Sequence, residues 1–525
     1  MPDGPVLRYG ASASASLSVL LASSWLLRFG TRSVRRLGTL PKRRQAVYAG
    51  VGYEWNVCEA EGFLAESSVE WDGTRSHPLF LEENLLGQHL LILGTTGTGK
   101  TRLLELLILQ AIRRGEPVVV VDPKGDERLL KVVRRAAGSR FRRFSLPEPK
   151  ESFRYNPIGE YVQSREVADR IAATLPSEGE AQSFRNYAWE LVDTVVRGLE
   201  AAGEPITFSA IREYGIERPW VLAAKVLSQQ YPKLPKAREP ARAAELYEDL
   251  VRRGKIEPDV TLESMIALAR RPREHHLKMA SSLVPILVRL GRCESLGPGW
   301  SWCDAERKRE VVYFSLGSLL GAETANAVAK MMLLDFQSFV GRRYFERRID
   351  PFSLFVDEMA DVLTPDFVHV LNKSRGAGIR VAGCAQTWSD FEAALSSRAR
   401  ALQLVGNMSS VVQFRAQSIP DAEAFADLSG RRLLRVPSEG EMYEPALFSS
   451  GFRGVDDYRA AFSRQSQRQD LPLVAPSVIL DLPTFHYFAR WGGRVYRGCV
   501  PWIDYDDLPH YDGRGDPPSV GNHRP

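Results

Sequence analysis

Short apolar runs alternate with amphipathic segments along much of this chain. Six runs of β-branched and other apolar residues have the length and composition of buried strands: His89–Gly94, Pro117–Asp122, Glu310–Leu316, Phe352–Asp357, Ile379–Ala385 and Ser410–Ala416. Several of these runs precede segments with a helical spacing of apolar residues, such as Arg102–Arg113. Because strands that alternate with helices usually form a parallel sheet covered by helices, the pattern predicts an α/β fold.

The pattern changes between the second and third predicted strands. There the apolar residues follow helical periodicity with hardly a strand signal, and helices are expected at Glu166–Thr174, Phe184–Ala202, Ala243–Arg253 and Leu277–Leu290. The aromatic residues Phe184, Tyr187 and Trp189 are expected to belong to the core of this region. The segment is therefore interpreted as an all-α insertion.

With 525 residues, the chain is long enough for several domains. We expect an α/β domain formed by residues 46–163 and 301–503, interrupted by an all-α domain at 164–300, and a loose acidic tail at 504–525. The composition, with 44% hydrophobic and 25% charged residues, excludes wholesale disorder. The five cysteines form no CxxC pair and are too few for a disulfide framework, which favours a reducing compartment.

The positive charge of the chain is concentrated at its N-terminus. Residues 1–50 carry eight basic side chains and one acidic one, a net charge of +7, whereas the whole chain carries +5. Residues 9–27 are uncharged and long enough to cross a bilayer, although six of them are serines. Residues 1–45 are therefore interpreted as a basic, membrane-proximal segment, with either a single weak transmembrane helix at 9–27 or a disordered basic arm.

The segment after the first predicted strand has the P-loop pattern of a glycine, four residues and Gly-Lys-Ser/Thr. Its residues are Gly94, Thr95, Thr96, Gly97, Thr98, Gly99, Lys100 and Thr101. Glycines let the backbone N–H groups wrap around phosphate, and the following helix adds a favourable dipole. Lys100 is expected to neutralise the β- and γ-phosphates of ATP, and the Thr101 hydroxyl to bind Mg²⁺.

The predicted strand Phe352–Asp357 ends in two acids, Asp357 and Glu358. A P-loop site needs one carboxylate for the magnesium shell and a second one to polarise the attacking water. Asp357 is assigned the first role and Glu358 the second, which predicts ATP hydrolysis and not binding alone.

Two further residues are candidates for the same chemistry. Gln386 follows the strand Ile379–Ala385, so its side chain is expected at the carboxyl edge of the sheet, where it would sense the γ-phosphate or orient water. Arg375 lies in a glycine-containing loop before that strand and is a candidate arginine finger for a neighbouring subunit. The alternatives are an ordinary polar strand end for Gln386 and a solvated surface side chain for Arg375.

These motifs together resemble those of the TraD/TraG-type coupling ATPases of type IV secretion and conjugation, a branch of the HerA/FtsK superfamily. The resemblance covers about residues 85–430 and rests on five segments: the P-loop, Asp122–Asp126, Tyr155–Ile158, Val356–Glu358 and Ala385–Thr387. It implies a RecA-like nucleotide-binding domain split by an all-α domain. It also implies a homo-hexamer at the cytoplasmic face of the bacterial inner membrane.

The function that the resemblance implies is ATP-driven delivery of DNA, as a relaxase-bound single strand, into a type IV secretion channel. The expected partners are therefore DNA, the relaxase and the components of that channel, and the expected cofactors are ATP and Mg²⁺. Family members commonly carry two transmembrane helices, whereas this N-terminus has room for one. Two alternatives therefore remain open: a cytoplasmic HerA/FtsK-like DNA translocase in DNA processing or defence, and a substrate receptor that uses nucleotide only for assembly.

Overall fold

The computed structural model describes residues 35–36, 46–66, 75–176, 179, 181–232, 240–445 and 458–504. The expected span at 9–27 and nearly all of the acidic tail therefore lie outside the described residues. In the described part of the chain, no helix has the length and hydrophobicity that a membrane crossing requires. The chain divides into two compact units, here called unit 1 (1–107, 384–390 and 408–510) and unit 2 (108–383, 391–407 and 511–525).

Unit 1 contains a mixed sheet with the strand order β3-β2-β14-β13-β10-β4. Its strands are β2 (Ala46–Glu54), β3 (His77–Glu82), β4 (Leu90–Leu93), β10 (Ser410–Gln413), β13 (His486–Trp491) and β14 (Arg494–Cys499). β4 and β10 are parallel and fully buried, and the other neighbours are antiparallel. Gly492 and Gly493 connect β13 to β14 with φ angles of 58° and 76°, the left-handed conformation of a tight hairpin turn.

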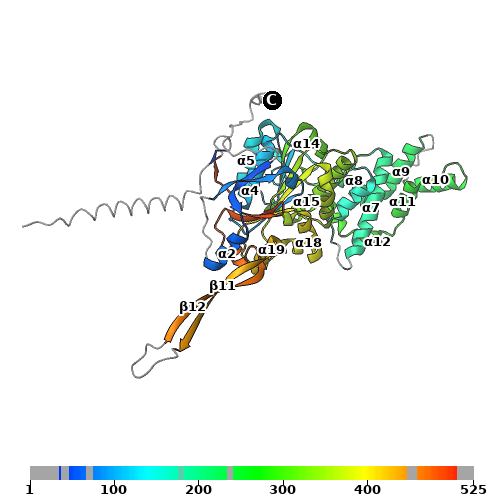
Figure 1. The fold of residues 1–525 in the computed structure, drawn as a ribbon. Helices are drawn as coiled ribbons and strands as arrows, with labels where there is room; N and C mark the ends of the chain where they lie inside the picture. The colour runs from blue at the N-terminus through cyan, green and yellow to red at the C-terminus, as the bar shows by residue number, and fades with distance from the viewer. Residues whose placement is uncertain are drawn as a thin grey trace, which may run out of the picture. The chain divides into compact units, whose positions relative to one another are not determined.

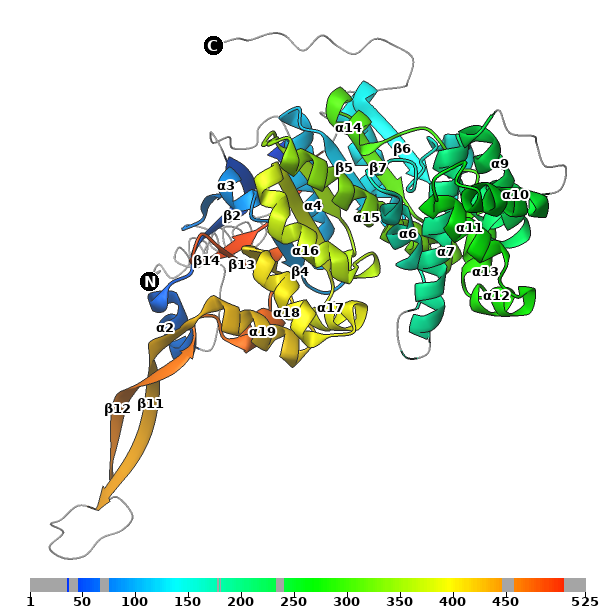
Figure 2. The ribbon, with the colours of Figure 1, turned by 90° about the vertical axis from the view of Figure 1, so that its right-hand side faces the viewer.

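A long antiparallel hairpin projects from unit 1 (Figures 1 and 2). It is formed by β11 (Arg431–Pro445) and β12 (Tyr458–Pro472). Helix α2 (Val57–Glu66) lies against the base of the hairpin, where the Arg435 N–H donates a hydrogen bond of 2.9 Å to Glu61 Oε1. The remaining short elements of unit 1 are β1 (Arg35–Arg36), α3 (Glu83–Leu86), α19 (Ile419–Ser429), α20 (Pro476–Leu480) and β15 (Ile503–Asp504).

Unit 2 contains a parallel sheet with the strand order β9-β8-β5-β7-β6. Its strands are β5 (Val118–Asp122), β6 (Phe141–Ser145), β7 (Val311–Ser315), β8 (Phe352–Val356) and β9 (Ile379–Ala385), of which the last two residues belong to unit 1. Every residue of β5, β7 and β8 is buried. Strands that are covered on both faces read as continuous apolar runs, which is why these three are visible in the sequence.

Helices flank this sheet and connect its strands. They are α4 (Lys100–Arg113) and α17 (Trp388–Leu395), which both begin in unit 1, and α5 (Glu127–Ala137), α14 (Trp302–Lys308), α15 (Ser318–Phe345), α16 (Pro365–Ser374) and α18 (Arg398–Asn407). The mostly parallel sheet with its helices confirms the predicted α/β fold class.

A group of helices lies between β6 and β7 in the sequence and gathers beyond the β6 edge of the sheet of unit 2 (Figure 2). Its members are α6 (Ser164–Ala172), α7 (Ala181–Ala202), α8 (Phe208–Arg212), α9 (Pro219–Gln230), α10 (Pro240–Arg252), α11 (Val260–Ala269), α12 (Arg273–Met279) and α13 (Leu283–Gly291). A single π-helical turn, Glu213–Glu217, links α8 to α9. We refer to this group as the helical region.

A buried polar network ties the helical region to the sheet. The Arg170 guanidinium, on α6, is 1% exposed and lies 3.1 Å from Asp335 Oδ1 on α15. It also donates hydrogen bonds of 2.8 Å to the Pro157 carbonyl and 2.9 Å to Ser338 Oγ. The second oxygen of Asp335 accepts hydrogen bonds from Tyr155 Oη (2.7 Å) and Trp302 Nε1 (3.0 Å). The ion pair and these hydrogen bonds offset part of the cost of burying both charges, although Arg170 Nε has no hydrogen-bond partner and Asp335 Oδ1 has only the ion pair.

We expect Arg170→Met to destabilise the protein by about 3–5 kcal/mol, because it leaves the Asp335 carboxylate buried without its cation. The measurement is the midpoint of urea unfolding followed by tryptophan fluorescence. The control is Lys131→Met, since Lys131 forms an ion pair with Glu127 on α5 in which both side chains are exposed. The control should change stability by at most about 1 kcal/mol. Equal midpoints for the two variants would contradict this role for Arg170.

Candidate nucleotide-binding site

The P-loop of unit 1 connects the end of β4 to the start of α4. Three of its residues need the conformations that glycine favours, since Gly94, Gly97 and Gly99 have φ angles of 143°, 78° and 121°. A Cβ atom on Gly94 would also lie 2.6 Å from Cβ of Phe414, closer than two carbon atoms can approach. The loop therefore depends on glycine both for its backbone angles and for its packing.

Lys100 is the first residue of α4 and lies folded back over the loop. Its side chain is buried, and Nζ donates a hydrogen bond of 3.1 Å to the Thr95 carbonyl. The Thr98 hydroxyl donates to the same carbonyl at 2.7 Å. The next residue, Thr101, is half-buried in the first turn of the 14-residue helix. Backbone N–H groups, a helix N-terminus and an ammonium group thus meet in one turn, which is the arrangement that binds phosphate.

Two aromatic residues that the sequence reasoning missed hold the P-loop in place. The Phe485 N–H donates a hydrogen bond of 2.8 Å to the Thr98 carbonyl, and a Cβ atom on Gly99 would lie 3.0 Å from the Phe485 ring. Phe414 packs against Gly94, and the carbonyl of the next residue, Arg415, accepts from the Thr95 N–H at 3.0 Å. No pattern in the sequence connects these residues to a loop more than 300 positions away.

Gln386 is half-buried and lies directly after the carboxyl end of β9. The backbone beyond it is held by two carboxylates. Asp390 accepts a hydrogen bond of 2.9 Å from the Thr387 N–H, and the buried Asp421 of α19 accepts one of 2.9 Å from the Trp388 N–H. Asp421 is therefore a further positioning residue that the sequence did not indicate.

In unit 2, Asp357 and Glu358 follow directly after β8. Asp357 is buried, and its N–H donates a hydrogen bond of 3.0 Å to the Val121 carbonyl of β5. Glu358 has φ and ψ angles of 48° and 59°, in the left-handed region that costs a residue with a side chain about 1 kcal/mol or more. Such strain is found most often where function requires a side chain to point in an unusual direction.

Glu358 forms an ion pair with Lys124, which follows β5. Lys124 Nζ donates a hydrogen bond of 2.6 Å to Glu358 Oε1. Burial alone would lower the pKa of Lys124, but the hydrogen bond and the negative charge of Glu358 outweigh burial, so that the pKa is raised. The pair therefore holds the ammonium charged and directs the Glu358 carboxylate toward the end of β5.

The turn that carries Lys124 is itself organised by the buried Asp122. Its carboxylate accepts hydrogen bonds from the backbone N–H groups of Lys124 (3.1 Å) and Gly125 (2.8 Å) and from the Tyr313 hydroxyl. Burial and the negative charge of Asp122 raise the pKa of Tyr313, so this phenol stays protonated as a donor. Hydrogen bonds to Asp122 thus fix the turn Asp122–Asp126, which places Lys124 against Glu358.

Arg375 is exposed and lies in a 3₁₀ turn, Arg375–Ala377, after α16. Its neighbour Gly376 packs against the Tyr344 ring, since a Cβ atom there would lie 3.1 Å from Tyr344 Cε2. Phe345 and Ile349, which follow Tyr344 along the chain, are 87% and 78% exposed. The candidate finger therefore lies on a surface that also carries exposed apolar side chains.

The predicted site residues thus fall into three groups. Unit 1 holds the P-loop and Gln386, whereas unit 2 holds Asp357 and Glu358 together with Lys124 and, in a separate turn, Arg375. In the described part of the chain, no group of three or more His, Cys, Asp or Glu side chains forms a metal site by itself. Thr101 in unit 1 and Asp357 in unit 2 each offer an oxygen donor, the type of ligand that Mg²⁺ prefers.

Two family models match the chain. Residues 73–189 match the model described as the central domain of the helicase HerA, and residues 351–484 match the one described as the TraM recognition site of TraD and TraG. The first match contains the P-loop and Lys124, and the second contains Asp357, Glu358, Arg375 and Gln386. A comparison with the curated proteins gives no significant match.

Among solved structures, the chain resembles those of a plasmid coupling protein. The unbound bacterial conjugative coupling protein TrwBdeltaN70 is 16% identical, with a TM-score of 0.55, and the match covers 90% of this chain and 97% of that one. TrwB with a non-hydrolysable ATP analogue is 17% identical, with a TM-score of 0.55 and 89% and 97% coverage. TrwB with ADP and Mg²⁺ is 16% identical, with a TM-score of 0.51 and 91% and 97% coverage.

At these identities the structures support the fold, and the two family models support the family. The resemblance stated from the sequence motifs is confirmed, as is the P-loop ATPase activity class. With a HerA-type segment at residues 73–189 and a TraD- and TraG-type segment at residues 351–484, the chain resembles the TraD/TraG-type coupling ATPases of the HerA/FtsK superfamily.

Proposed function

We propose that this protein hydrolyses ATP in order to move DNA. The observation that carries the proposal is the conformation of the P-loop. Three of its glycines have positive φ angles, and Lys100 at the start of α4 is buried against the loop. A loop of this shape binds the β- and γ-phosphates of a nucleoside triphosphate. TrwB, which has the same fold, has been observed with an ATP analogue and with ADP and Mg²⁺, which supports the same nucleotide and metal here.

The roles of the other residues follow from the chemistry of phosphoryl transfer. Lys100 stabilises the charge that develops on the transferred phosphoryl group, and Thr101 and Asp357 hold Mg²⁺. Glu358 polarises the attacking water, and its strained backbone together with the Lys124 ion pair supports a directed role for its carboxylate. Gln386 senses the γ-phosphate or orients that water.

The cargo we propose is DNA, delivered as a relaxase-bound single strand to a type IV secretion channel. The match of residues 351–484 to the TraM recognition site of TraD and TraG supports partners of this kind. The proposed assembly is a homo-hexamer at the cytoplasmic face of the bacterial inner membrane, tethered there by residues 1–45. The match to the HerA helicase domain keeps one alternative open, a HerA/FtsK-like DNA translocase in DNA processing or defence.

Arg375 is proposed to reach the nucleotide of a neighbouring subunit. It is exposed on a surface where Phe345 and Ile349 also leave most of their apolar area open to solvent. Exposed apolar side chains of this size mark surfaces that other proteins cover. The proposed role requires that a second copy of the chain cover this surface with the part that carries its nucleotide site.

We expect Glu358→Gln to lower the ATPase kcat by about 100-fold or more while ATP binding is retained, because only water activation is lost. Lys100→Ala should abolish turnover by removing the charge on the transferred phosphoryl group. The measurements are steady-state ATPase rates and the affinity for a fluorescent ATP analogue. Glu127→Gln, at an exposed position of α5, is the matched control and should keep the wild-type rate. Rapid turnover by Glu358→Gln would exclude Glu358 from water activation.

Mixing two inactive variants tests whether Arg375 acts between subunits. The Arg375→Ala variant has an intact P-loop, and the Lys100→Ala variant has an intact Arg375. A mixed ring therefore contains some interfaces at which both Lys100 and Arg375 are present. We expect the mixture to regain activity that neither variant has, measured as ATPase rate at constant total protein. Arg398→Ala, which removes another exposed arginine of unit 2, should remain active by itself. A mixture as inactive as its parents, despite demonstrated subunit exchange, would place the action of Arg375 within its own subunit.

A further inference from the structure

Unit 2 contains a cavity of about 720 Å³ whose charged lining residues are all basic. Arg185 of α7, Lys330 of α15 and Arg400 of α18 line it, although they lie far apart in the sequence. No acidic side chain is among the described residues that line the cavity, and none of these three cations forms an ion pair with a described carboxylate. Three positive charges thus share one cavity without a balancing negative charge from the described chain.

The surroundings strengthen the field of these cations. Leu175, Leu363 and Leu395 contribute apolar walls, which screen charge less than water does. Burial, and to a smaller extent the positive charge of Arg185, lower the pKa of Lys330. An anion in the cavity would relieve this repulsion, and phosphate is one of the anions that both arginine and lysine bind.

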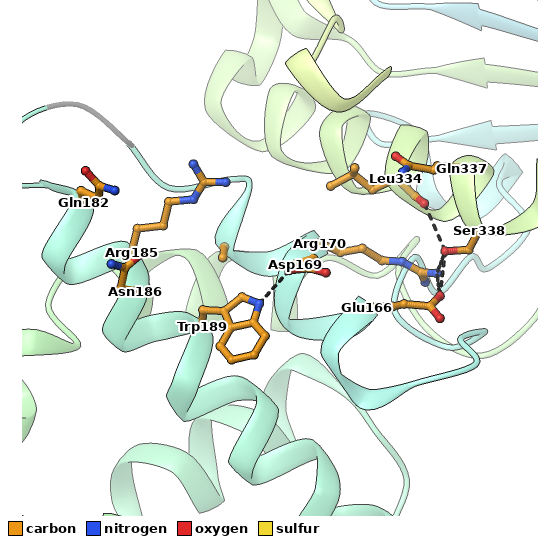
Figure 3. A pocket seen from close by; sticks show the side chains of 11 residues that line it. Glu166, Asp169, Arg170, Gln182, Arg185, Asn186, Trp189, Leu334, Gln337 and Ser338 are labelled. Carbon is orange, nitrogen blue, oxygen red and sulfur yellow. Dashed lines mark hydrogen bonds and ion pairs between the residues drawn. The ribbon is translucent and has the colours of Figure 1, made fainter. Parts of the chain in front are cut away.

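Arg185 also lines a second cavity, of about 510 Å³, shown in Figure 3. Gln182, Asn186 and Trp189 of α7 face this cavity, because positions three, four and seven residues apart share one face of a helix. Of the three aromatic residues expected in the core, Tyr187 is buried, whereas Phe184 and Trp189 are only half-buried. The Trp189 Nε1–H donates a hydrogen bond of 2.7 Å to Asp169 Oδ1, which sets the orientation of the indole ring.

The two acids of this second cavity are engaged by protein groups. Asp169 accepts the indole hydrogen bond, and Glu166 accepts hydrogen bonds from the Gln163 N–H (3.2 Å) and the Ser338 hydroxyl (2.8 Å). The second cavity therefore offers an oriented aromatic ring and side-chain amides, next to a cavity that offers three cations. An aromatic ring beside a cationic groove is the combination that binds single-stranded nucleic acid without sequence preference.

We propose that Arg185, Lys330 and Arg400 bind the phosphodiester backbone of a nucleic-acid strand and that Trp189 stacks on one of its bases. The cavity itself indicates an anionic ligand. The choice of a nucleic acid over free phosphate rests on Trp189 and on the proposed DNA-moving function.

The first test measures binding of a fluorescent 20-nucleotide oligo-dT to the full chain by anisotropy. Replacing the three cations together by Gln should weaken binding about tenfold or more and reduce the dependence on salt by about two counterions, as three lost phosphate contacts predict. The control replaces three exposed cations of the same unit, Lys255, Arg292 and Lys373, by Gln and should weaken binding less than about twofold. Thermal unfolding and binding of an ATP analogue confirm that each variant is folded.

The second test distinguishes stacking on a base from binding of the phosphodiester backbone. Trp189→Leu should weaken binding of oligo-dT about fivefold or more but leave the affinity for an abasic strand of equal length unchanged, whereas Trp189→Phe should retain most of the oligo-dT affinity. Equal weakening on both strands would contradict the stacking role. Tripolyphosphate is the probe for a free anion: if it binds in a way that requires the three cations while oligo-dT affinity does not require them, the nucleic-acid assignment is overturned.

The wild-type protein distinguishes this inference from the proposed function. If it binds oligo-dT and the triple variant binds equally well, the cavity is excluded as a binding site and the proposed function stands. If the wild-type protein binds neither single- nor double-stranded DNA, both the cavity assignment and the proposed DNA cargo are contradicted.

Discussion

The hydrogen-bond ladder of β5 is the interaction on which the carboxyl edge of the sheet in unit 2 depends. β5 is fully buried and pairs in parallel with β7 on one side and with β8 on the other. The ladder continues past the strand ends, where the Asp357 N–H donates to the Val121 carbonyl and the Leu316 N–H donates to the Asp122 carbonyl. The carboxyl ends of three strands are thereby held at one level, so a charged side chain that follows any of them has a defined position.

Because the ladder is buried, each charged residue at this edge of the sheet depends on other residues that donate hydrogen bonds to it or hold it in place. A carboxylate such as Asp122 is stable there only because backbone N–H groups and the Tyr313 hydroxyl donate to it. In doing so it shapes the turn that carries Lys124, and Lys124 in turn directs Glu358. A similar layer supports unit 1, where Phe414 and Phe485 hold the P-loop. A substitution in these supporting residues would therefore affect ATP hydrolysis only through the positions of the residues that they hold.

The sequence predicts the parts of the fold in which a single strand or helix contains its own signal. The six predicted strands correspond to β4, β5, β7, β8, β9 and β10 within three residues at each end, because these strands are continuous apolar runs. The antiparallel strands of unit 1 were missed, although Gly492-Gly493 was a usable turn signal between β13 and β14. One predicted helix, Leu277–Leu290, is two helices in the structure, since α12 ends at Met279 and α13 begins at Leu283.

The same distinction between local and long-range signals applies to the candidate site. The P-loop, Asp357 and Glu358 were found because each motif is local, whereas the Lys124–Glu358 pair joins residues 234 positions apart and no single-sequence pattern encodes it. The same holds for the cations of the helical region and its neighbours, which come together only through the packing of α7, α15 and α18. Long-range pairings of this kind are set by tertiary structure and become visible only in it.

The central claim, that ATP hydrolysis drives work on DNA, is tested most directly by the ATPase rate of the full chain with and without DNA. The measurement requires protein of determined oligomeric state, saturating ATP and Mg²⁺, and separate additions of single- and double-stranded DNA of equal nucleotide concentration. We expect a basal rate that rises several-fold with DNA in parallel with the formation of higher oligomers. A rate that is unchanged by either form of DNA, in protein that binds ATP and assembles, would contradict it.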